Sequence, residues 1–138
     1  MKFERISYGE LNARQKETYN FHKIAGVLAD YGFTSIRLSD DWQGADFIAV
    51  HIDGKTTLRV QLKGRLSFNK KYSGKGVFIA FPYQNSWYLY PHDTLQQTVF
   101  GAKSYGASDS WTVNGGYSVG KLGTELLTLL RPYRLPTE

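Results

Sequence analysis

Two runs of β-forming residues that flank an Asp-Gly pair constrain this chain more than any other feature. The runs cover residues 46–52 and 56–63, and the Asp-Gly pair at 53–54 is a strong signal for a two-residue hairpin turn. If that pair forms the centre of the turn, the register places Asp46 directly opposite Gln61. Directly opposed residues share one face of a sheet, with Cβ atoms about 4.5–5.5 Å apart. The sequence therefore predicts that these two polar side chains lie side by side.

Side-chain alternation along the two predicted strands separates an apolar core face from a polar face. The polar face ends in the carboxylate of Asp46, the amide of Gln61 and the ammonium of Lys63. A hard cation such as Mg²⁺ binds oxygen, which Asp46, Gln61 and the Leu62 backbone carbonyl can supply from adjacent strand ends. Lys63 would stand beside such an ion, where a lysine can orient metal-bound water or stabilise charge on a phosphate. The alternative is an ordinary polar surface with a solvated lysine at the strand end.

The spacing of these residues resembles that of the PD-(D/E)XK nuclease superfamily. Asp46 is followed, after fourteen intervening residues, by Gln61-x-Lys63, which is similar to the motif variant in which glutamine replaces the second acidic residue. Mrr-like restriction enzymes and one group of intron-encoded homing endonucleases share this variant. The chain departs from the family in having Ala45 instead of proline before Asp46. The resemblance covers roughly residues 11–100.

The resemblance implies an α/β fold with a restriction-endonuclease-like core, in which a central mixed β-sheet flanked by helices carries the motif on its second and third strands. It implies a metal-dependent endonuclease of the restriction or homing type that hydrolyses DNA phosphodiester bonds. The implied cofactor is Mg²⁺, with Mn²⁺ as a substitute, and the implied partners are double-stranded DNA and further copies of the chain in a homodimer or higher homo-oligomer. The implied catalytic residues are Glu17, Asp46, Gln61 and Lys63, and the implied metal ligands are Asp46, Gln61, Leu62 and Glu17.

Two other functions fit the same residues. One is a Holliday-junction or other structure-selective resolvase with the same catalytic side chains. The other is a catalytically inactive nucleic-acid-binding module that keeps the fold. Because Gln61 is neutral, it holds a metal ion less strongly than a carboxylate would. A measurement of metal binding would therefore distinguish the two enzyme hypotheses from the binding-module hypothesis.

A helix predicted over residues 11–30 offers an additional negative charge. Glu17 lies four residues before Phe21 on the apolar stripe of this helix, so its carboxylate is expected on the side that faces the sheet. Members of the superfamily often place a glutamate from the first helix beside the metal, and Glu17 matches that position. The alternative is that Glu17 lies at the edge of the stripe and pairs with Arg14 or Lys16.

Positive charge is concentrated just after the motif. Seventeen Lys and Arg residues against twelve Asp and Glu give a net charge of +5, which favours a polyanionic partner. Segment 64–76 is predicted as a basic loop that tracks a nucleic-acid backbone and whose aromatic residues stack on a distorted or unpaired base. The expected nucleic-acid contacts are Arg65, Lys70, Lys71, Tyr72 and Lys75. The alternative is an ordinary solvated loop.

The remaining patterns predict the other elements. These are a strand at 34–38, a loop at 40–44, strands at 77–81 and 87–90 joined by a turn at 82–86, a short helix capped by Asp93 and ending at Phe100, and a last apolar helix at 124–130. Asp40 and Asp41 are expected to cap or solvate their loop, although they could also assist a metal. Segment 101–123 is expected to be ordered, either as a substrate-reading excursion or as a hairpin about residues 114–115.

Length and composition limit the number of domains, the kinds of metal site and the location of the protein. With 138 residues and 41% apolar content, the chain is predicted to form one domain over residues 1–138. The absence of cysteine excludes disulfides and thiolate metal sites, and the three scattered histidines are expected to have structural roles. Without a signal peptide or a long apolar run, the sequence favours a cytoplasmic protein with no membrane partner.

Overall fold

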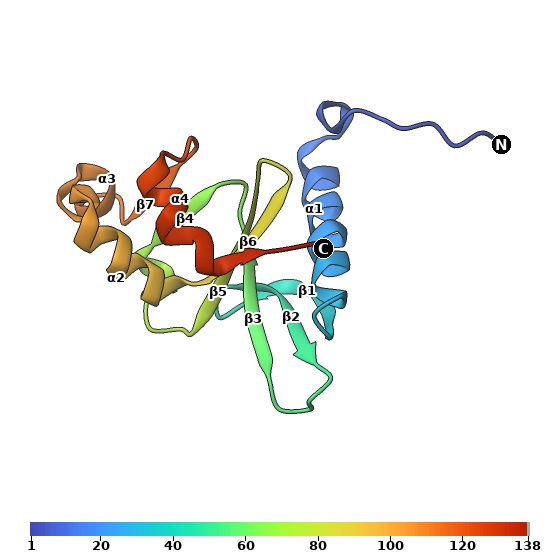
Figure 1. Cartoon of the computed structure of the whole chain (residues 1–138), viewed down its shortest axis with the longest axis horizontal. Helices are drawn as coiled ribbons and strands as arrows, with labels where there is room; N and C mark the ends of the chain where they lie inside the picture. Colours follow the sequence, from blue (N-terminus) through green and yellow to red (C-terminus); the bar gives the residue numbers. More distant parts are fainter. Residues whose placement is uncertain (138) are drawn as a thin grey trace.

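A six-stranded mixed sheet forms the centre of the fold in the computed structural model, which describes residues 1–137 (Figure 1). Its strands lie in the order β1-β2-β3-β5-β6-β8, where the β3–β5 pair is parallel and the other neighbours are antiparallel. The six strands are β1 (Phe33–Trp42), β2 (Ala45–His51), β3 (Thr57–Leu62), β5 (Val77–Tyr83), β6 (Ser86–Pro91) and β8 (Arg134–Leu135). A separate two-stranded sheet pairs β4 (Leu66–Asn69) with β7 (Gly116–Val119).

Helices cover both faces of the central sheet. The helices are α1 (Ala13–Ala29), α2 (His92–Ala102), α3 (Asp109–Thr112) and α4 (Thr124–Leu130), with 3-10 turns at Tyr8–Glu10, Lys70–Tyr72, Ser104–Ala107 and Arg131–Tyr133. Figure 1 shows α1 on one side of the sheet and α2 and α4 on the other. The predicted α/β class, with a central mixed sheet flanked by helices, is confirmed. The second and third strands of this sheet carry Asp46 and Gln61, in the order that the resemblance implied.

The first helix begins and ends close to where the sequence predicts. Asn12 caps it, because its side chain accepts a hydrogen bond from the Gln15 N–H at 2.8 Å while the Gln15 side chain accepts from the Asn12 N–H at 2.9 Å. Ile24 and Leu28 are buried on the face that packs on the sheet. Glu17 lies two turns before Ile24, so the packing of this helix determines where its carboxylate lies.

Alternating strand residues supply two separate cores. The core under α1 contains Ile24, Leu28, Phe47, Ala49 and Val60. The core on the opposite face contains residues of β5, β6, α2 and α4, among them Ile79, Phe81, Tyr90, Leu95 and Leu130. The core face predicted for the β2–β3 hairpin is therefore confirmed.

The register of the β2–β3 hairpin is the one predicted. The observed pairs run from Phe47 opposite Val60 to Val50 opposite Thr57, and the same register places Asp46 opposite Gln61. The turn itself is wider than expected. Its last ladder hydrogen bond runs from the His51 N–H to the Thr56 carbonyl at 2.9 Å, so the loop has four residues instead of two. A loop longer by two residues preserves the faces of both strands, because side chains alternate with period two.

Two turns are tighter and their strands longer than predicted. β1 extends to Trp42, so Asp40 and Asp41 belong to a strand instead of a loop. The turn that follows has Gln43 at φ 50° and Gly44 at φ 85°. Two successive residues with positive φ form the kind of two-residue turn that lets strands pair up to their ends. Likewise, β5 and β6 meet at residues 84–85, where both φ values are positive, and the predicted turn at 82–86 is too long.

The predicted basic loop at 64–76 is largely regular structure. It contains β4 and a 3-10 turn, and β4 pairs with β7. Phe68 and Tyr72 are only 1% and 2% exposed. The expectation that these rings stack on a base is therefore wrong, because both rings already fill the core.

Segment 101–123 is ordered, but it contains no hairpin about residues 114–115. Gly115 has φ 76° and its N–H donates to the Trp111 carbonyl at 3.1 Å, which ends α3. The following residues form β7 against β4. The predicted hairpin is wrong because the partner strand lies far back in the sequence.

The prediction that Asp93 caps α2 is also wrong. Pro91 occupies the cap position, and α2 extends to Ala102. Asp93 instead accepts the Gly74 N–H at 2.8 Å and lies 2.8 Å from His92 Nδ1. Buried His92 accepts the Asn69 N–H at 3.0 Å through Nε2, so it has a structural role, as expected. α4 spans Thr124–Leu130, the predicted range, and Leu126 and Leu130 complete the core.

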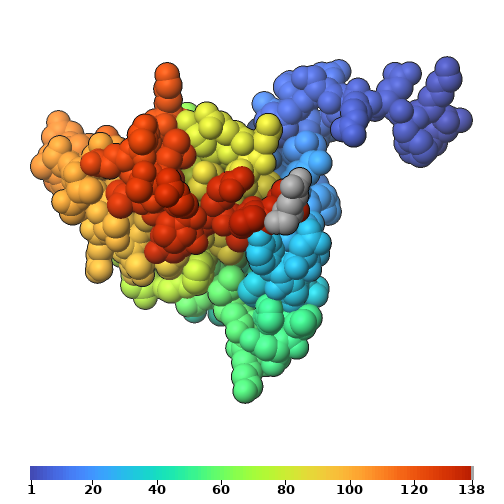
Figure 2. Space-filling view, in the orientation of Figure 1, coloured from blue at the N-terminus to red at the C-terminus, as the bar shows by residue number. Residues whose placement is uncertain are grey.

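The first residues extend away from the rest of the molecule, as Figure 2 shows at the blue end of the chain. Residues 1–10 are all exposed. Among residues 1–137, no helix combines the length and the apolar character needed to cross a membrane.

Candidate active site

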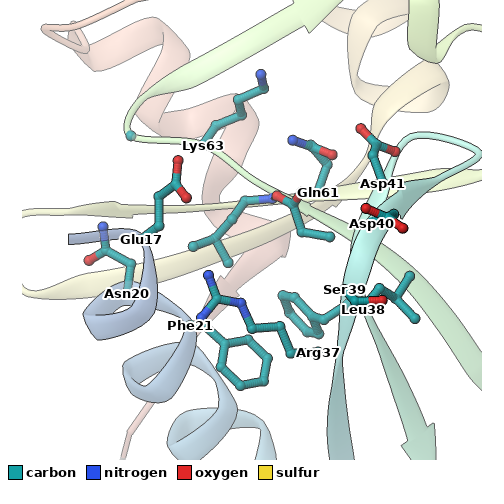
Figure 3. Close-up of a pocket in the computed structure, with 14 residues that line it drawn as sticks. Glu17, Asn20, Phe21, Arg37, Leu38, Ser39, Asp40, Asp41, Gln61 and Lys63 are labelled. Carbon is teal, nitrogen blue, oxygen red and sulfur yellow. The ribbon is translucent and has the colours of Figure 1, made fainter. Parts of the chain in front are cut away.

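A pocket of about 440 Å³ lies between α1, the end of β1, the start of β2 and the end of β3 (Figure 3). It brings together all of the residues expected to be catalytic or to bind metal, namely Glu17, Asp46, Gln61, Leu62 and Lys63. It also contains Asn20, Arg37, Asp40 and Asp41. The helix and the hairpin that the sequence predicts separately therefore meet at one hollow of the surface.

Asp46 is held by the backbone of the neighbouring strand. Its Oδ2 accepts the Leu62 N–H at 2.9 Å, which fixes the carboxylate beside the end of β3. Burial raises the pKa of Asp46 above its ordinary value, and the nearby charges of Asp41 and Glu17 raise it further. The Leu62 N–H and the Lys63 ammonium oppose this shift without cancelling it. The pocket thus concentrates negative charge in a place where a carboxylate is poorly solvated.

Gln61 is the polar group of the pocket that most requires an explanation. Its side chain is 8% exposed, and its Oε1 has no hydrogen-bond partner among residues 1–137. A buried acceptor without a partner costs about 1–3 kcal/mol, so proteins rarely retain one. A cation in the pocket would satisfy this oxygen.

Lys63 lies at the pocket wall beyond the end of β3. Its backbone N–H donates to the Ala80 carbonyl at 2.9 Å, which continues the parallel pairing with β5. Its ammonium lies 5.4 Å from the centre of the Tyr72 ring, a cation–π distance. Tyr72 therefore supports the lysine from within the core, a role that differs from the predicted contact with a base.

Glu17 lines the same pocket from α1, and Figure 3 shows it on the side of the pocket where Lys63 also lies. Its side chain is exposed. The alternative considered from the sequence was an ion pair with Arg14 or Lys16, and neither pair forms within residues 1–137. Its carboxylate is therefore available to a ligand of the pocket.

Sequence reasoning missed Arg37 and underrated Asp41. The Arg37 guanidinium donates to Thr18 Oγ1 at 2.9 Å and lies 5.6 Å from the centre of the Phe21 ring, so it is anchored to α1. Asp41 accepts the Gly44 N–H at 3.0 Å. Arg37 falls within the strand predicted at 34–38, whereas Asp41 lies in the part of β1 beyond it, after a register shift against β2 that no local pattern indicates.

The basic residues predicted to contact nucleic acid lie outside the pocket, beyond the end of β3. Arg65, Lys70, Lys71 and Lys75 are exposed. The Lys70 and Lys71 ammonium groups lie 5.4 Å and 5.2 Å from the centres of the Trp111 and Tyr72 rings, respectively. The four cations remain accessible to a polyanion, and two of them are held in place by aromatic rings.

Residues 1–137 contain no group of three or more His, Cys, Asp and Glu side chains arranged to hold a metal ion by themselves. A cation in the pocket would therefore need neutral oxygens in addition to carboxylates. The Gln61 amide oxygen and the Leu62 carbonyl are of this kind, and hard divalent cations accept such ligands. The donor set thus fits Mg²⁺ or Mn²⁺.

No protein-family model and no curated protein match the chain. Among solved structures, it is similar to Hjc, a Holliday junction resolvase from Archaeoglobus fulgidus, an archaeal hyperthermophile, with 17% sequence identity and a TM-score of 0.46. The similarity covers 56% of this chain and 74% of that chain.

Proposed function

We propose that this protein is a metal-dependent endonuclease that hydrolyses phosphodiester bonds in DNA. The observation that carries the proposal is the buried Gln61 oxygen, which has no partner among residues 1–137 and shares one pocket with Asp46 and Lys63. If the pocket had only a structural role, this unpaired oxygen would cost about 1–3 kcal/mol of stability with no compensating interaction. A cation-binding pocket gives it a function.

The Asp46 carboxylate, the Gln61 amide oxygen and the Leu62 carbonyl would hold Mg²⁺, with Mn²⁺ as a substitute. Glu17 would contribute from the opposite wall of the pocket. When bound, such an ion polarises a phosphate and lowers the pKa of a coordinated water. Binding would also compensate the burial of the Asp46 carboxylate and its repulsion by Asp41 and Glu17, which together raise the pKa of Asp46.

Lys63 would position the attacking water and stabilise negative charge as it builds on the phosphate. Arg37 is anchored at the pocket by Thr18 and would orient a phosphate oxygen through its remaining donors. Hydrolysis in line with the leaving group would produce a 5′-phosphate and a 3′-hydroxyl.

DNA is the proposed partner because the charge around the pocket is suited to a phosphate backbone. The net charge is +5, and exposed Arg65, Lys70, Lys71 and Lys75 lie just beyond the strand that carries Gln61. A homodimer is proposed if both strands of a duplex are cut, because one pocket cuts one strand.

Three outcomes are distinguished by the class of DNA that the protein binds or cuts. The first candidate is duplex DNA cut by a restriction or homing type of endonuclease. The second is a four-way junction, the substrate named for the similar archaeal protein. The third outcome is binding without cleavage, which the fold and basic surface would equally allow.

The test is cleavage of three labelled substrates by the purified chain: supercoiled plasmid, linear duplex and a synthetic four-way junction. Wild type should cut at least one of them in Mg²⁺ or Mn²⁺ and none in EDTA. Asp46→Asn should cut none, whereas Lys55→Ala, a change in the exposed hairpin turn, should cut like wild type. Equal cleavage by wild type and Asp46→Asn would mean that the pocket is not the active site.

A further inference from the structure

Gln61 leaves the proposed metal site short of one negative charge, and the sequence offered Glu17 as its source. The structure places a second carboxylate, Asp41, at the same pocket from the end of β1. Because no three acidic side chains form a metal cluster among residues 1–137, the identity of the second charged ligand decides the composition of the site.

Asp41 faces the polar group that lacks a partner. Figure 3 shows the Gln61 side chain of β3 pointing toward Asp41 of β1, although β2 lies between these two strands in the sheet. Gln61 is 8% exposed, and its Oε1 has no hydrogen-bond partner within residues 1–137. A carboxylate and an amide oxygen are both acceptors, so neither can donate a hydrogen bond to the other. A cation bound by both oxygens resolves this mismatch.

The turn after β1 fixes the position of Asp41. The Asp41 Oδ1 accepts the Gly44 N–H at 3.0 Å, which orients the carboxylate and leaves Oδ2 for another ligand. Arg59 secures the same turn from β3, since it donates to Gln43 Oε1 at 2.6 Å and to the Lys75 carbonyl. Asp41 is thus a pre-positioned group at the end of a paired strand.

Asp41 and Asp46 both line this pocket, so two carboxylates bring like charges to one hollow of the surface. A cation bound between like charges removes their repulsion.

We propose that Asp41 is a metal ligand of the pocket and binds the same divalent cation as Asp46 and Gln61. The inference rests on the metal site proposed above. It assigns the negative charge that Gln61 lacks to Asp41 instead of Glu17. Glu17, placed above among the ligands, then interacts with substrate or water and does not bind this ion.

The test is Mn²⁺ binding to the intact chain, measured by isothermal titration calorimetry. Asp41→Asn keeps an oxygen that can accept the Gly44 N–H, so the turn should persist while the charge is lost. Its Mn²⁺ affinity should fall at least about 10-fold, the lower limit seen when partners of metal ligands are removed. Asp30→Asn, at the exposed end of α1, changes the charge equally and should bind Mn²⁺ like wild type. Wild-type affinity in Asp41→Asn would overturn the inference.

Asp46→Asn separates this inference from the proposed function. If Asp46→Asn loses Mn²⁺ binding and Asp41→Asn does not, the metal site stands and the role of Asp41 is overturned. If both variants bind Mn²⁺ like wild type, the metal site itself is overturned.

A charge exchange tests whether the two positions share one ion. Gln61→Glu in the Asp41→Asn background returns the lost charge to the same site and should restore most of the Mn²⁺ affinity. Failure to restore it in a chain with wild-type circular dichroism would show that residues 41 and 61 do not share a cation, and would overturn the inference.

Discussion

At the scale of single residues, the proposed site depends on an even number of residues in the β2–β3 hairpin loop. Asp46 and Gln61 share a face because the number of residues in the hairpin loop is even, and this holds for the observed loop of four as well as for the predicted loop of two. The absence of a partner for Gln61 Oε1 could not be predicted in this way. It depends on α1 and β1, which close the pocket and contact the hairpin only in the tertiary structure.

Lys63→Ala should distinguish catalysis from binding. The change removes the ammonium but leaves Asp46, Gln61 and the exposed cations in place, so the cleavage rate should fall by about 10²–10⁴ while DNA affinity changes little. The measurements are single-turnover cleavage and fluorescence anisotropy on the same substrate, with Tm as the control for folding. Equal cleavage by wild type and Lys63→Ala would exclude Lys63 from the chemistry.

Asp46→Asn should stabilise the protein in the absence of metal. Because burial and like charges raise the folded-state pKa of Asp46 above 3.8, its ionised form favours the unfolded state at neutral pH. The asparagine can still accept the Leu62 N–H, so Tm at pH 7 in EDTA should rise. The difference should disappear as pH falls below 3.8, where both states of the wild type are protonated at this carboxyl. A lower Tm than wild type at pH 7 would contradict this account of the carboxylate.

At the scale of elements, local patterns predicted α1 and α4 well because each combines an apolar stripe with clear end signals. Asn12 begins α1, and Pro132 follows α4 closely. The same patterns failed for 64–76 and 101–123. β4 and β7 stabilise each other, and each has only four residues, too few to indicate a strand without its distant partner.

The exposed lysines of this region should contribute to DNA binding through their charge. Replacing Lys70, Lys71 and Lys75 by glutamate should weaken duplex binding and flatten its salt dependence, because each phosphate contact adds roughly 0.9 to the log–log slope. Lys55→Glu is the control at the far end of the β2–β3 hairpin. If the salt dependence of DNA binding is unchanged in the triple variant, DNA must contact another surface.

At the scale of the whole molecule, the sequence predicted the α/β class and the sheet at the centre, and the structure confirms both. The two cores on opposite faces of the sheet follow from the alternation of strand residues. The sequence could not predict the hydrogen bonds that join segments far apart in the chain. His92 and Asp93 join α2 to the segment that contains β4 through hydrogen bonds to Asn69 and Gly74, and no local pattern indicates such contacts.

Asp93→Asn should therefore destabilise the whole fold in a pH-dependent way. Burial raises the pKa of Asp93, but hydrogen bonds with His92 and Gly74 outweigh burial and hold the pKa below its ordinary value of 3.8. A carboxyl with a depressed pKa stabilises the fold above 3.8, and this contribution is lost as pH falls through the folded-state pKa. The Tm deficit of Asp93→Asn should be largest near pH 7 and shrink in acid. A deficit that is the same at every pH would show that the charge of Asp93 is not responsible.

The most direct test of the central claim is a crystal structure of the protein soaked in Mn²⁺, with anomalous diffraction used to locate the ion. The proposed function predicts one strong anomalous peak in the pocket, in contact with the Asp46 carboxylate and the Gln61 amide oxygen. No peak at that position in crystals with an accessible pocket, or a peak only on another surface, would contradict the claim that this pocket is a metal-dependent active site.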